Sequence, residues 1–200
     1  MKGKGIRPEE IRIDWQELMR FKRSFTEPVP KSQEEGFARA GIVSFHGRAR
    51  FVGPSSIQVK DNVLEGRYVV VAAGQKPADL KIPGAEHLTT SEQFLELEEL
   101  PKRILFIGGG YIAFEFAHVA VRAGAQVTIA HRGPRPLPRF DPDLVDQLVK
   151  SSRELGVDVQ LGTEVMGVEK SSGQLVVRAS ASGQQHIRGR HGRTCCGSCT

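Results

Sequence analysis

The pattern of hydrophobic and polar residues in the first half of the chain predicts helices followed by short strands. Residues 15–25 place apolar side chains at helical spacing until Pro28 and Pro30 interrupt the pattern. A capping box at residues 32–35 predicts a second short helix, which Gly41 can end. Strand-like segments separated by turn-forming residues then predict a small antiparallel excursion, at residues 42–45, 49–52 and 56–59.

The run Tyr68–Ala73 is continuously apolar and rich in β-branched residues. This composition is typical of a strand buried on both faces of a parallel sheet. The run ends at Gly74, and a glycine at the carboxyl end of such a strand can let a ligand approach the backbone. A plain strand-ending turn is the alternative interpretation of the same glycine.

The second half of the chain repeats an alternation of strand and helix, and residues 81–84 read as a linker into it. A helix is expected from Asp141 and Pro142, an N-cap followed by a first-turn proline, to a stop at Gly156. Strands are expected on the hydrophobic pattern at residues 104–107, 127–130, 157–161, 165–169 and 174–179. The sequence therefore predicts an α/β fold in which parallel sheets carry small antiparallel excursions.

Composition is that of an ordinary globular chain: 200 residues, 39% hydrophobic and 26% charged. The net charge of +5 comes from the two ends, which carry six basic residues and no acid: Lys2, Lys4, Arg7, Arg188, Arg190 and Arg193. A nucleic-acid partner is therefore not expected. The chain shows no secretory signal and no apolar run of membrane-spanning length, so we expect no membrane association and a cytoplasmic location.

Residues 183–200 hold all three cysteines, Cys195, Cys196 and Cys199, and we interpret this segment as a disordered tail. The C-x-x-C at 196–199 lacks the following helix that lowers a redox thiol pKa, and its spacing to histidine matches no common zinc finger. No metal site is expected there.

The segment Gly108-Gly109-Gly110-Tyr111-Ile112-Ala113 fits the G-x-G-x-x-A pattern of dinucleotide-binding folds, with a strand before it and a helix and strand after it. Gly108 permits the tight turn, Gly110 allows a pyrophosphate to approach the backbone, and Ala113 keeps helix and strand close. The free amides at the start of the helix supply the anion site.

The end of the second strand indicates which nucleotide is bound. An NAD site usually places a carboxylate there for the ribose hydroxyl, but this chain has His131 and Arg132, followed by Arg135 and Arg139. Guanidinium groups suit the 2′-phosphate of NADP, so we expect NADP, with NAD the less favoured cofactor. A solvated basic loop is the alternative.

The segments VVVAAGQKPADLKIPG, IGGGYIAFEFAHVAVRAGAQVTI and FDPDL resemble the pyridine nucleotide-disulfide oxidoreductase family. The resemblance implies FAD as a second cofactor, a fold with two dinucleotide-binding domains, and homodimers of the full-length parent. It also implies that Ala73 and Gly74 contact the flavin, that Tyr111 is the aromatic lid over it, and that Glu115 lies near the nicotinamide. Tyr111 and Glu115 are thus the catalytic candidates. Both are also expected to bind cofactor, together with Ile112 and the glycines at 108–110.

The family's first flavin fingerprint, redox cysteine pair and C-terminal interface domain have no counterpart in this sequence. We therefore expect an internal fragment: residues 1–100 as a partial FAD domain and linker, 101–182 as the NAD(P)-binding domain. The resemblance implies an enzyme that passes hydride from NADPH to FAD and on to a disulfide or other acceptor. A non-catalytic NAD(P)-binding module and a fragment without function are the alternatives.

Overall fold

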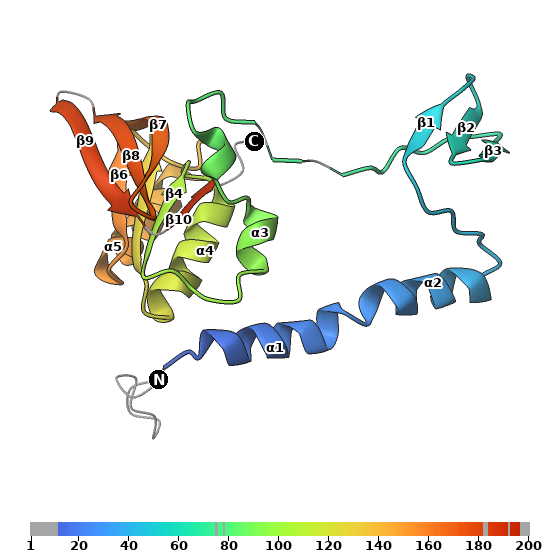
Figure 1. The fold of residues 1–200 in the computed structure, drawn as a ribbon, viewed down its shortest axis with the longest axis horizontal. Helices are drawn as coiled ribbons and strands as arrows, with labels where there is room; N and C mark the ends of the chain where they lie inside the picture. Colours follow the sequence, from blue (N-terminus) through green and yellow to red (C-terminus); the bar gives the residue numbers. More distant parts are fainter. Residues whose placement is uncertain (1–11, 75, 78, 182–183, 192, 197–200) are drawn as a thin grey trace. The chain divides into compact units, whose positions relative to one another are not determined.

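The computed structural model describes residues 12–74, 76–77, 79–181, 184–191 and 193–196, with side chains described as far as residue 180. These residues divide into two compact units (Figure 1): residues 20–76 form the smaller unit, and the remaining described residues form the larger one. The N-terminal lysines and Cys199 of the sequence analysis lie outside the described residues. In the described part of the chain, no helix is long and apolar enough to cross a membrane.

A four-stranded parallel sheet forms the centre of the larger unit, in the order β10-β4-β5-β6. Its strands are β4 (Arg103–Ile107), β5 (Gln126–His131), β6 (Asp158–Leu161) and β10 (Arg193–Cys196). Helix α4 (Tyr111–Arg122) connects β4 to β5, and α5 (Pro142–Glu154) connects β5 to β6. This arrangement confirms the predicted strand–helix–strand unit around the glycine motif.

An antiparallel sheet of β7 (Thr163–Ser171), β8 (Gln174–Ala181) and β9 (Gln184–His191) forms a second layer. The β7–β8 turn confirms the predicted hairpin: Ser172 and Gly173 have φ angles of 50° and 74°. Positive φ at both central residues belongs to the type I′ turn, whose twist matches that of paired strands.

Two hydrophobic clusters lie on opposite faces of the parallel sheet. Ile104, Phe106 and Ile129 face α4 and α5, whereas Leu105 and Ile107 face β7 and β8. Alternate residues of each strand point to opposite faces, so the apolar run of β4 serves both clusters. The larger unit therefore has three layers: helices, parallel sheet and antiparallel sheet (Figure 1).

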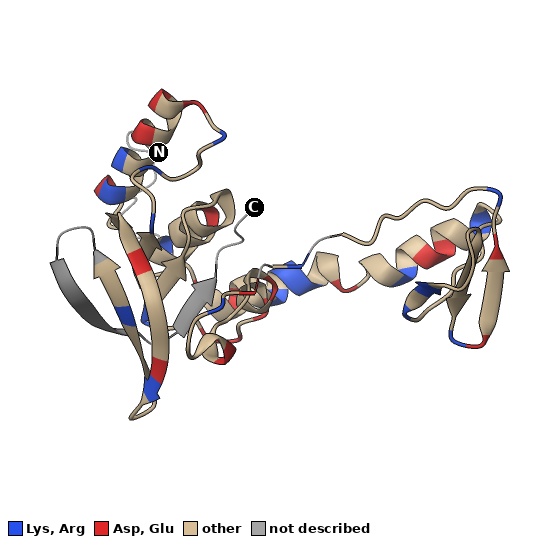
Figure 2. Cartoon of the chain, turned by 90° about the horizontal axis from the view of Figure 1, so that it is seen from above, with Lys and Arg blue, Asp and Glu red and all other residues tan. Residues whose placement is uncertain are grey.

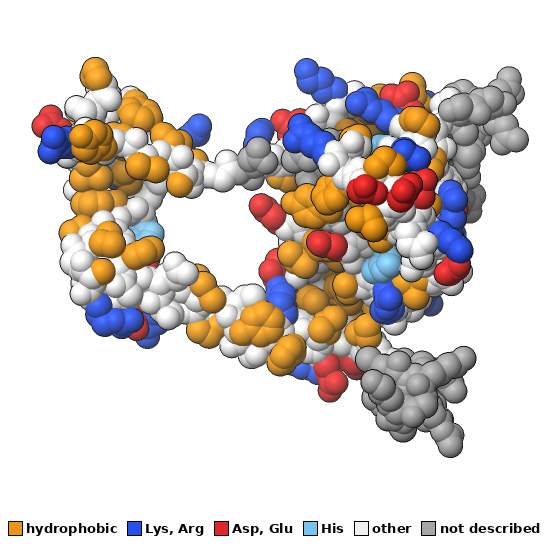
Figure 3. Space-filling model, turned by 180° about the vertical axis from the view of Figure 1, so that it is seen from behind, with side chains coloured by type: hydrophobic (Ala, Val, Ile, Leu, Met, Phe, Trp, Pro, Cys, Tyr) orange, Lys and Arg blue, Asp and Glu red, His pale blue; other side chains and the backbone are white. Residues whose placement is uncertain are grey.

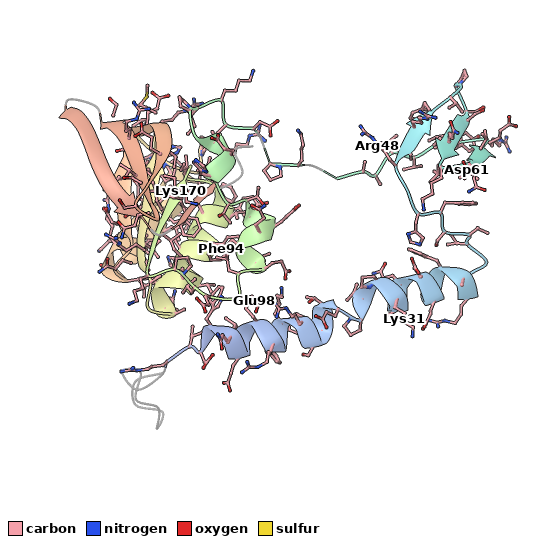
Figure 4. All side chains as sticks on the ribbon, in the orientation of Figure 1. Lys31, Arg48, Asp61, Phe94, Glu98 and Lys170 are labelled. Carbon is pink, nitrogen blue, oxygen red and sulfur yellow. The ribbon has the colours of Figure 1, made fainter. Side chains whose placement is uncertain are left out.

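Aromatic side chains attach the N-terminal segment to the helical layer. The Trp15 ring, at the start of α1 (Trp15–Thr26), meets Phe94 edge to face at 5.8 Å between centroids. Phe94, labelled in Figure 4, belongs to α3 (Ser91–Leu95) and also stacks on Phe116 at 4.6 Å. These rings bury large apolar area and fix the residues that precede β4 against α4.

The predicted linker at residues 81–84 is packed against the antiparallel layer. The Val168 amide donates to the Pro83 carbonyl at 2.9 Å, and Ile82 joins the second hydrophobic cluster. Gly84 has a φ of 81° and leads into a 3₁₀ turn, Ala85–His87. The segment is thus part of the folded unit.

The smaller unit contains α2 (Val29–Arg39) and an antiparallel sheet of β1 (Ala49–Phe51), β2 (Ser56–Val59) and β3 (Asn62–Glu65). The strands predicted at residues 49–52 and 56–59 are confirmed as β1 and β2, but residues 42–45 form no strand and β3 was not predicted. Helix α2 begins at Val29, before the predicted box at 32–35. Proline in the first turn of a helix needs no amide proton, so Pro30 does not exclude this earlier start.

The expected buried strand at residues 68–73 is absent: the prediction is wrong for this segment, which is extended but pairs with no strand of the described chain. Tyr68 and Val70 are 80% and 87% exposed. Apolar side chains over the smaller unit are visible in Figure 3. A strand requires a neighbour to accept its backbone hydrogen bonds, and pattern alone does not supply that neighbour.

The tail also differs from expectation, since β9 and β10 occupy much of the segment predicted to be disordered. Strand β10 pairs in parallel with β4, and β9 pairs antiparallel with β8. Both extend a sheet edge whose backbone groups would otherwise lack strand partners, which favours strand formation in a segment of weak intrinsic preference.

Candidate functional site

The carboxyl end of β4 leads into the glycine loop, which we define as residues 108–110. Gly108 has a φ of 100°, a conformation that favours glycine, and its amide donates to the Ala130 carbonyl of β5 at 2.8 Å. The turn therefore leaves the sheet at its carboxyl edge, where ligands bind in open α/β sheets. This is the role that the sequence assigned to Gly108.

Gly110 is the N-cap of α4, with extended backbone (φ −81°, ψ 170°) and no side chain to cap the helix. The amides of Tyr111 and Ile112 lie in the first turn, where helical geometry provides no acceptor, and the described residues supply none to either. These amides and the positive end of the helix dipole can hold an anion such as a pyrophosphate. Ala113 is fully buried, so its small side chain lets α4 lie close to the sheet.

The loop after β5, residues 132–140, carries Arg132, Arg135 and Arg139, and we call it the arginine loop. It is attached to the glycine loop at Gly109. The Gly109 amide donates to His131 Nδ1 at 3.1 Å, and the Leu137 amide donates to the Gly109 carbonyl at 3.2 Å. A Cβ at Gly109 would lie 2.7 Å from Pro136 Cβ, so no larger residue fits beneath the loop. Gly109 therefore serves the junction of the two loops and has no amide to offer a phosphate.

His131 uses both ring nitrogens for the main chain. Besides Nδ1 on Gly109, Nε2 lies 3.0 Å from the Arg135 carbonyl. From its position at the end of β5, His131 was expected among the nucleotide ligands. The structure gives it contacts to the protein backbone that position alone could not indicate.

The three arginines have different surroundings. Arg135 forms an ion pair with Asp146 of α5, 3.1 Å between Nη2 and Oδ2, with both side chains about half exposed. Arg132 and Arg139 are exposed, and neither has an ion-pair partner in the described part of the chain. A hollow of 360 Å³ adjoins Arg135 and α5, lined in part by Pro134 and Lys150. Arg132, the residue directly after β5, is thus without an ion-pair partner in the described part of the chain.

Both signs of charge occur over the larger unit (Figure 2), so the character of the arginine loop comes from its own residues. No carboxylate occupies the last position of β5 or the next five residues. The acceptor that a ribose 2′-hydroxyl requires is therefore missing at the place where it is usually found.

Tyr111 and Glu115 lie one helical turn apart on α4 and both are exposed, with Tyr111 at 49%. Residues at i and i+4 share a helix face, so a ligand at the start of α4 can meet both. Ala73 and Gly74, the predicted flavin contacts, are exposed and belong to the extended end of the smaller unit, where Gly74 has a φ of 72°. The described structure does not place that segment relative to the glycine loop.

One partly buried polar contact was not expected from sequence. His118 Nε2 lies 2.8 Å from Ser152 Oγ, whose own proton goes to the Leu148 carbonyl at 2.7 Å. Because Ser152 is fully buried and spends its proton on Leu148, His118 donates to it and links α4 to α5. Burial, with a smaller contribution from the charge of Arg122, lowers the pKa of His118 from 6.5.

Residues 7–197 match the family model described as pyridine nucleotide-disulphide oxidoreductase. The fold and glycine loop define a dinucleotide-binding α/β protein, and this match assigns its family. The chain belongs to the pyridine nucleotide-disulphide oxidoreductases, as its sequence motifs indicated.

Individual relatives agree with this assignment. A glutathione reductase from Burkholderia cepacia is 34% identical over 148 residues, covering 74% of this chain and 33% of that protein. The mitochondrial dihydrolipoyl dehydrogenase of Pisum sativum is 29% identical and covers 92% and 38%. The Cu(II) complex of the HOCl-induced flavoprotein disulfide reductase RclA from Escherichia coli superimposes with a TM-score of 0.82 at 25% identity, covering 92% and 43%. The chain therefore spans 33% to 43% of the length of these relatives.

Proposed function

We propose that this chain provides the NADPH-binding part of an FAD-dependent oxidoreductase. The observation that carries the proposal is the pairing of two anion sites at one sheet edge. The open amides of Tyr111 and Ile112 suit a pyrophosphate, and unpaired Arg132 lies at the end of the neighbouring strand, β5.

NADP is favoured over NAD by the chemistry of the arginine loop. A guanidinium can donate two hydrogen bonds to phosphate oxygens, whereas it offers no acceptor for a ribose hydroxyl. Arg139, also exposed and without an ion-pair partner among the described residues, is available as a second donor from the far end of the loop. Arg135 is held by Asp146 and so contributes less.

The flavin part of the proposal concerns the whole protein. FAD, when bound, would accept hydride from NADPH and deliver electrons to a disulfide or other acceptor. The family resemblance implies that Tyr111 covers the flavin ring, that Glu115 lies near the nicotinamide ring, and that Ala73 and Gly74 contact the flavin. In the described chain Ala73 and Gly74 are exposed and outside any sheet, so these residues do not by themselves form a flavin site.

The two anion sites at one sheet edge also support a second candidate function, that of an NAD(P)-binding module without catalysis. We propose that residues 1–100 belong to the flavin domain and its linker, and residues 101–182 to the nucleotide domain. The nucleotide domain then binds nucleotide whether or not the flavin domain binds FAD, because β4, α4 and β5 form a complete strand–helix–strand motif within it.

Competition by two nucleotide fragments tests the proposed function. Adenosine 2′,5′-bisphosphate carries the phosphate that distinguishes NADP, and 5′-AMP does not. Calorimetric titration of the chain with NADPH in the presence of each fragment should show displacement by the bisphosphate at concentrations at least tenfold below those needed for 5′-AMP. Equal displacement by both would refute recognition of the 2′-phosphate.

A further inference from the structure

His131 connects the two loops that the nucleotide must span. Its Nδ1 accepts a hydrogen bond from the Gly109 amide, 3.1 Å away. A ring nitrogen that accepts carries no proton, so the imidazole is neutral and its proton resides on Nε2. Nε2 therefore donates to the Arg135 carbonyl at 3.0 Å. Both polar atoms of the side chain are used, and neither remains for a phosphate.

Further contacts fix the same junction. The Leu137 amide donates to the Gly109 carbonyl, and the Gly162 amide of the β6–β7 connection donates to the Gly133 carbonyl at 2.9 Å. Leu137 adopts a φ of 50°, unusual for a residue with a side chain, and is buried. Such strain persists only where the surroundings determine the conformation. The arginine loop is thus held at several points.

We propose that His131 is a positioning residue for nucleotide selectivity. It fixes the distance between the amides at the start of α4 and the guanidinium of Arg132. The pyrophosphate and the 2′-phosphate belong to one molecule, so both can be bound only if the loops keep a set separation. This inference rests on the proposed function, and it replaces the role of ligand that the sequence suggested for His131.

The free protein provides a first test that needs no nucleotide. Nitrogen-15 NMR of the imidazole should show protonated Nε2 and bare Nδ1 for His131 in the folded chain at pH 7.5. The Gly109 amide should exchange with solvent at least tenfold more slowly than in a His131→Leu variant. A proton on Nδ1, or a Gly109 amide that exchanges equally fast in both proteins, would overturn the inference.

Conservative variants separate the two hydrogen bonds. His131→Asn can keep an acceptor near the Gly109 amide, and His131→Gln can keep a donor near the Arg135 carbonyl. We expect Asn to retain most of the slow exchange of Gly109, and Gln and Leu to lose it. These two polar variants also keep the test open if His131→Leu does not fold.

Nucleotide affinities then test the effect on selectivity. The ratio of NADH to NADPH dissociation constants should fall at least fivefold in His131→Leu and less in His131→Asn. In an Arg132→Ala background, His131→Leu should leave that ratio within about twofold, because a positioning residue has no effect once the positioned group is gone. A further independent fall in the Arg132→Ala background would show that His131 contacts the phosphate itself and would refute positioning.

The two proposals fail in distinguishable ways. If the wild-type chain binds NADPH no better than NADH, the proposed NADP site is refuted. If the wild-type preference is present but unchanged in His131→Leu, the positioning role is refuted while the NADP site stands.

Discussion

The indole of Trp15 donates a hydrogen bond to the carbonyl of Leu97 at 2.7 Å, joining two buried residues 82 positions apart. The contact closes the N-terminal segment onto the chain just before β4. Trp15→Phe keeps an aromatic ring for Phe94 but leaves the Leu97 carbonyl without this partner. We expect a loss of about 1–3 kcal/mol in the free energy of unfolding.

Urea unfolding followed by circular dichroism measures this loss, because the variant removes the only tryptophan of the chain. Phe21→Leu is the matched control, since Phe21 lies on the same helix with its side chain 67% exposed. A control that costs as much as Trp15→Phe would show that the helix, not the buried hydrogen bond, is responsible.

Gly84 is expected to tolerate no side chain. A Cβ there would lie 1.7 Å from the Val168 carbonyl oxygen, and the φ of 81° is unfavourable for other residues. Gly84→Ala should destabilise the chain by about 2–5 kcal/mol, combining backbone strain with overpacking. Gly124→Ala is the control: it has a similar φ of 93° but nothing within 4 Å, so only about 1–2 kcal/mol should be lost. Equal losses would mean that the contact with β7 is unimportant.

His118 should make stability fall in mild acid. Its pKa is lowered in the folded chain from 6.5, because burial, and secondarily Arg122, disfavours the charged ring. The unfolded chain therefore binds the proton more readily. The contribution is fully present above pH 6.5 and is lost as pH falls through the lower pKa of the folded state.

Urea midpoints between pH 8 and pH 5 measure this dependence. His118→Gln keeps an amide donor for Ser152 and does not titrate, so its stability should decline less over the same range. If wild type and variant decline in parallel, the acid sensitivity comes from other groups.

The purified chain should bind pyridine nucleotide and hold FAD weakly or not at all. The only glycine loop of the dinucleotide type in the described residues is 108–110, and the candidate flavin contacts at Ala73 and Gly74 are exposed. Absorbance near 450 nm after purification and addition of FAD measures flavin binding. Stoichiometric FAD on the chain would contradict this expectation.

The local part of the site was predictable from sequence, and the long-range part was not. The positive φ of Gly108, the cap at Gly110 and the N-cap at Asp141 are local conformations set by neighbours within four residues, which a motif records. The junction of Gly109 with His131 joins residues 22 apart and depends on how β4 and β5 align. No pattern in either segment alone reports that alignment.

Residues 68–73 show an error of the opposite kind, in which a local pattern predicted a strand that does not form. Their composition fits a buried strand, yet in the described chain they have no neighbouring strand, and Val70 is 87% exposed. Pattern reports what a segment could bury, whereas pairing depends on the rest of the sheet. In α5, likewise, an apolar residue is not always a core residue: Leu144 is 71% exposed, while Val145 and Val149 are buried.

The most direct measurement is the affinity of Arg132→Ala for the two nucleotides. If the exposed Arg132 guanidinium bonds the 2′-phosphate, its removal costs about 1.5–3 kcal/mol for NADPH, or about 10- to 150-fold in affinity. NADH, which lacks that phosphate, should lose little. Arg122→Ala is the control of equal charge, because Arg122 lies at the opposite end of α4 from the glycine loop.

Calorimetric titrations of wild type, Arg132→Ala and Arg122→Ala with NADPH and NADH at one fixed ionic strength decide the matter, since salt screens the general effect of surface charge. We expect the NADPH preference to collapse in Arg132→Ala and to survive in Arg122→Ala. Equal losses for NADPH and NADH in Arg132→Ala would contradict the account and remove the basis for an NADP site.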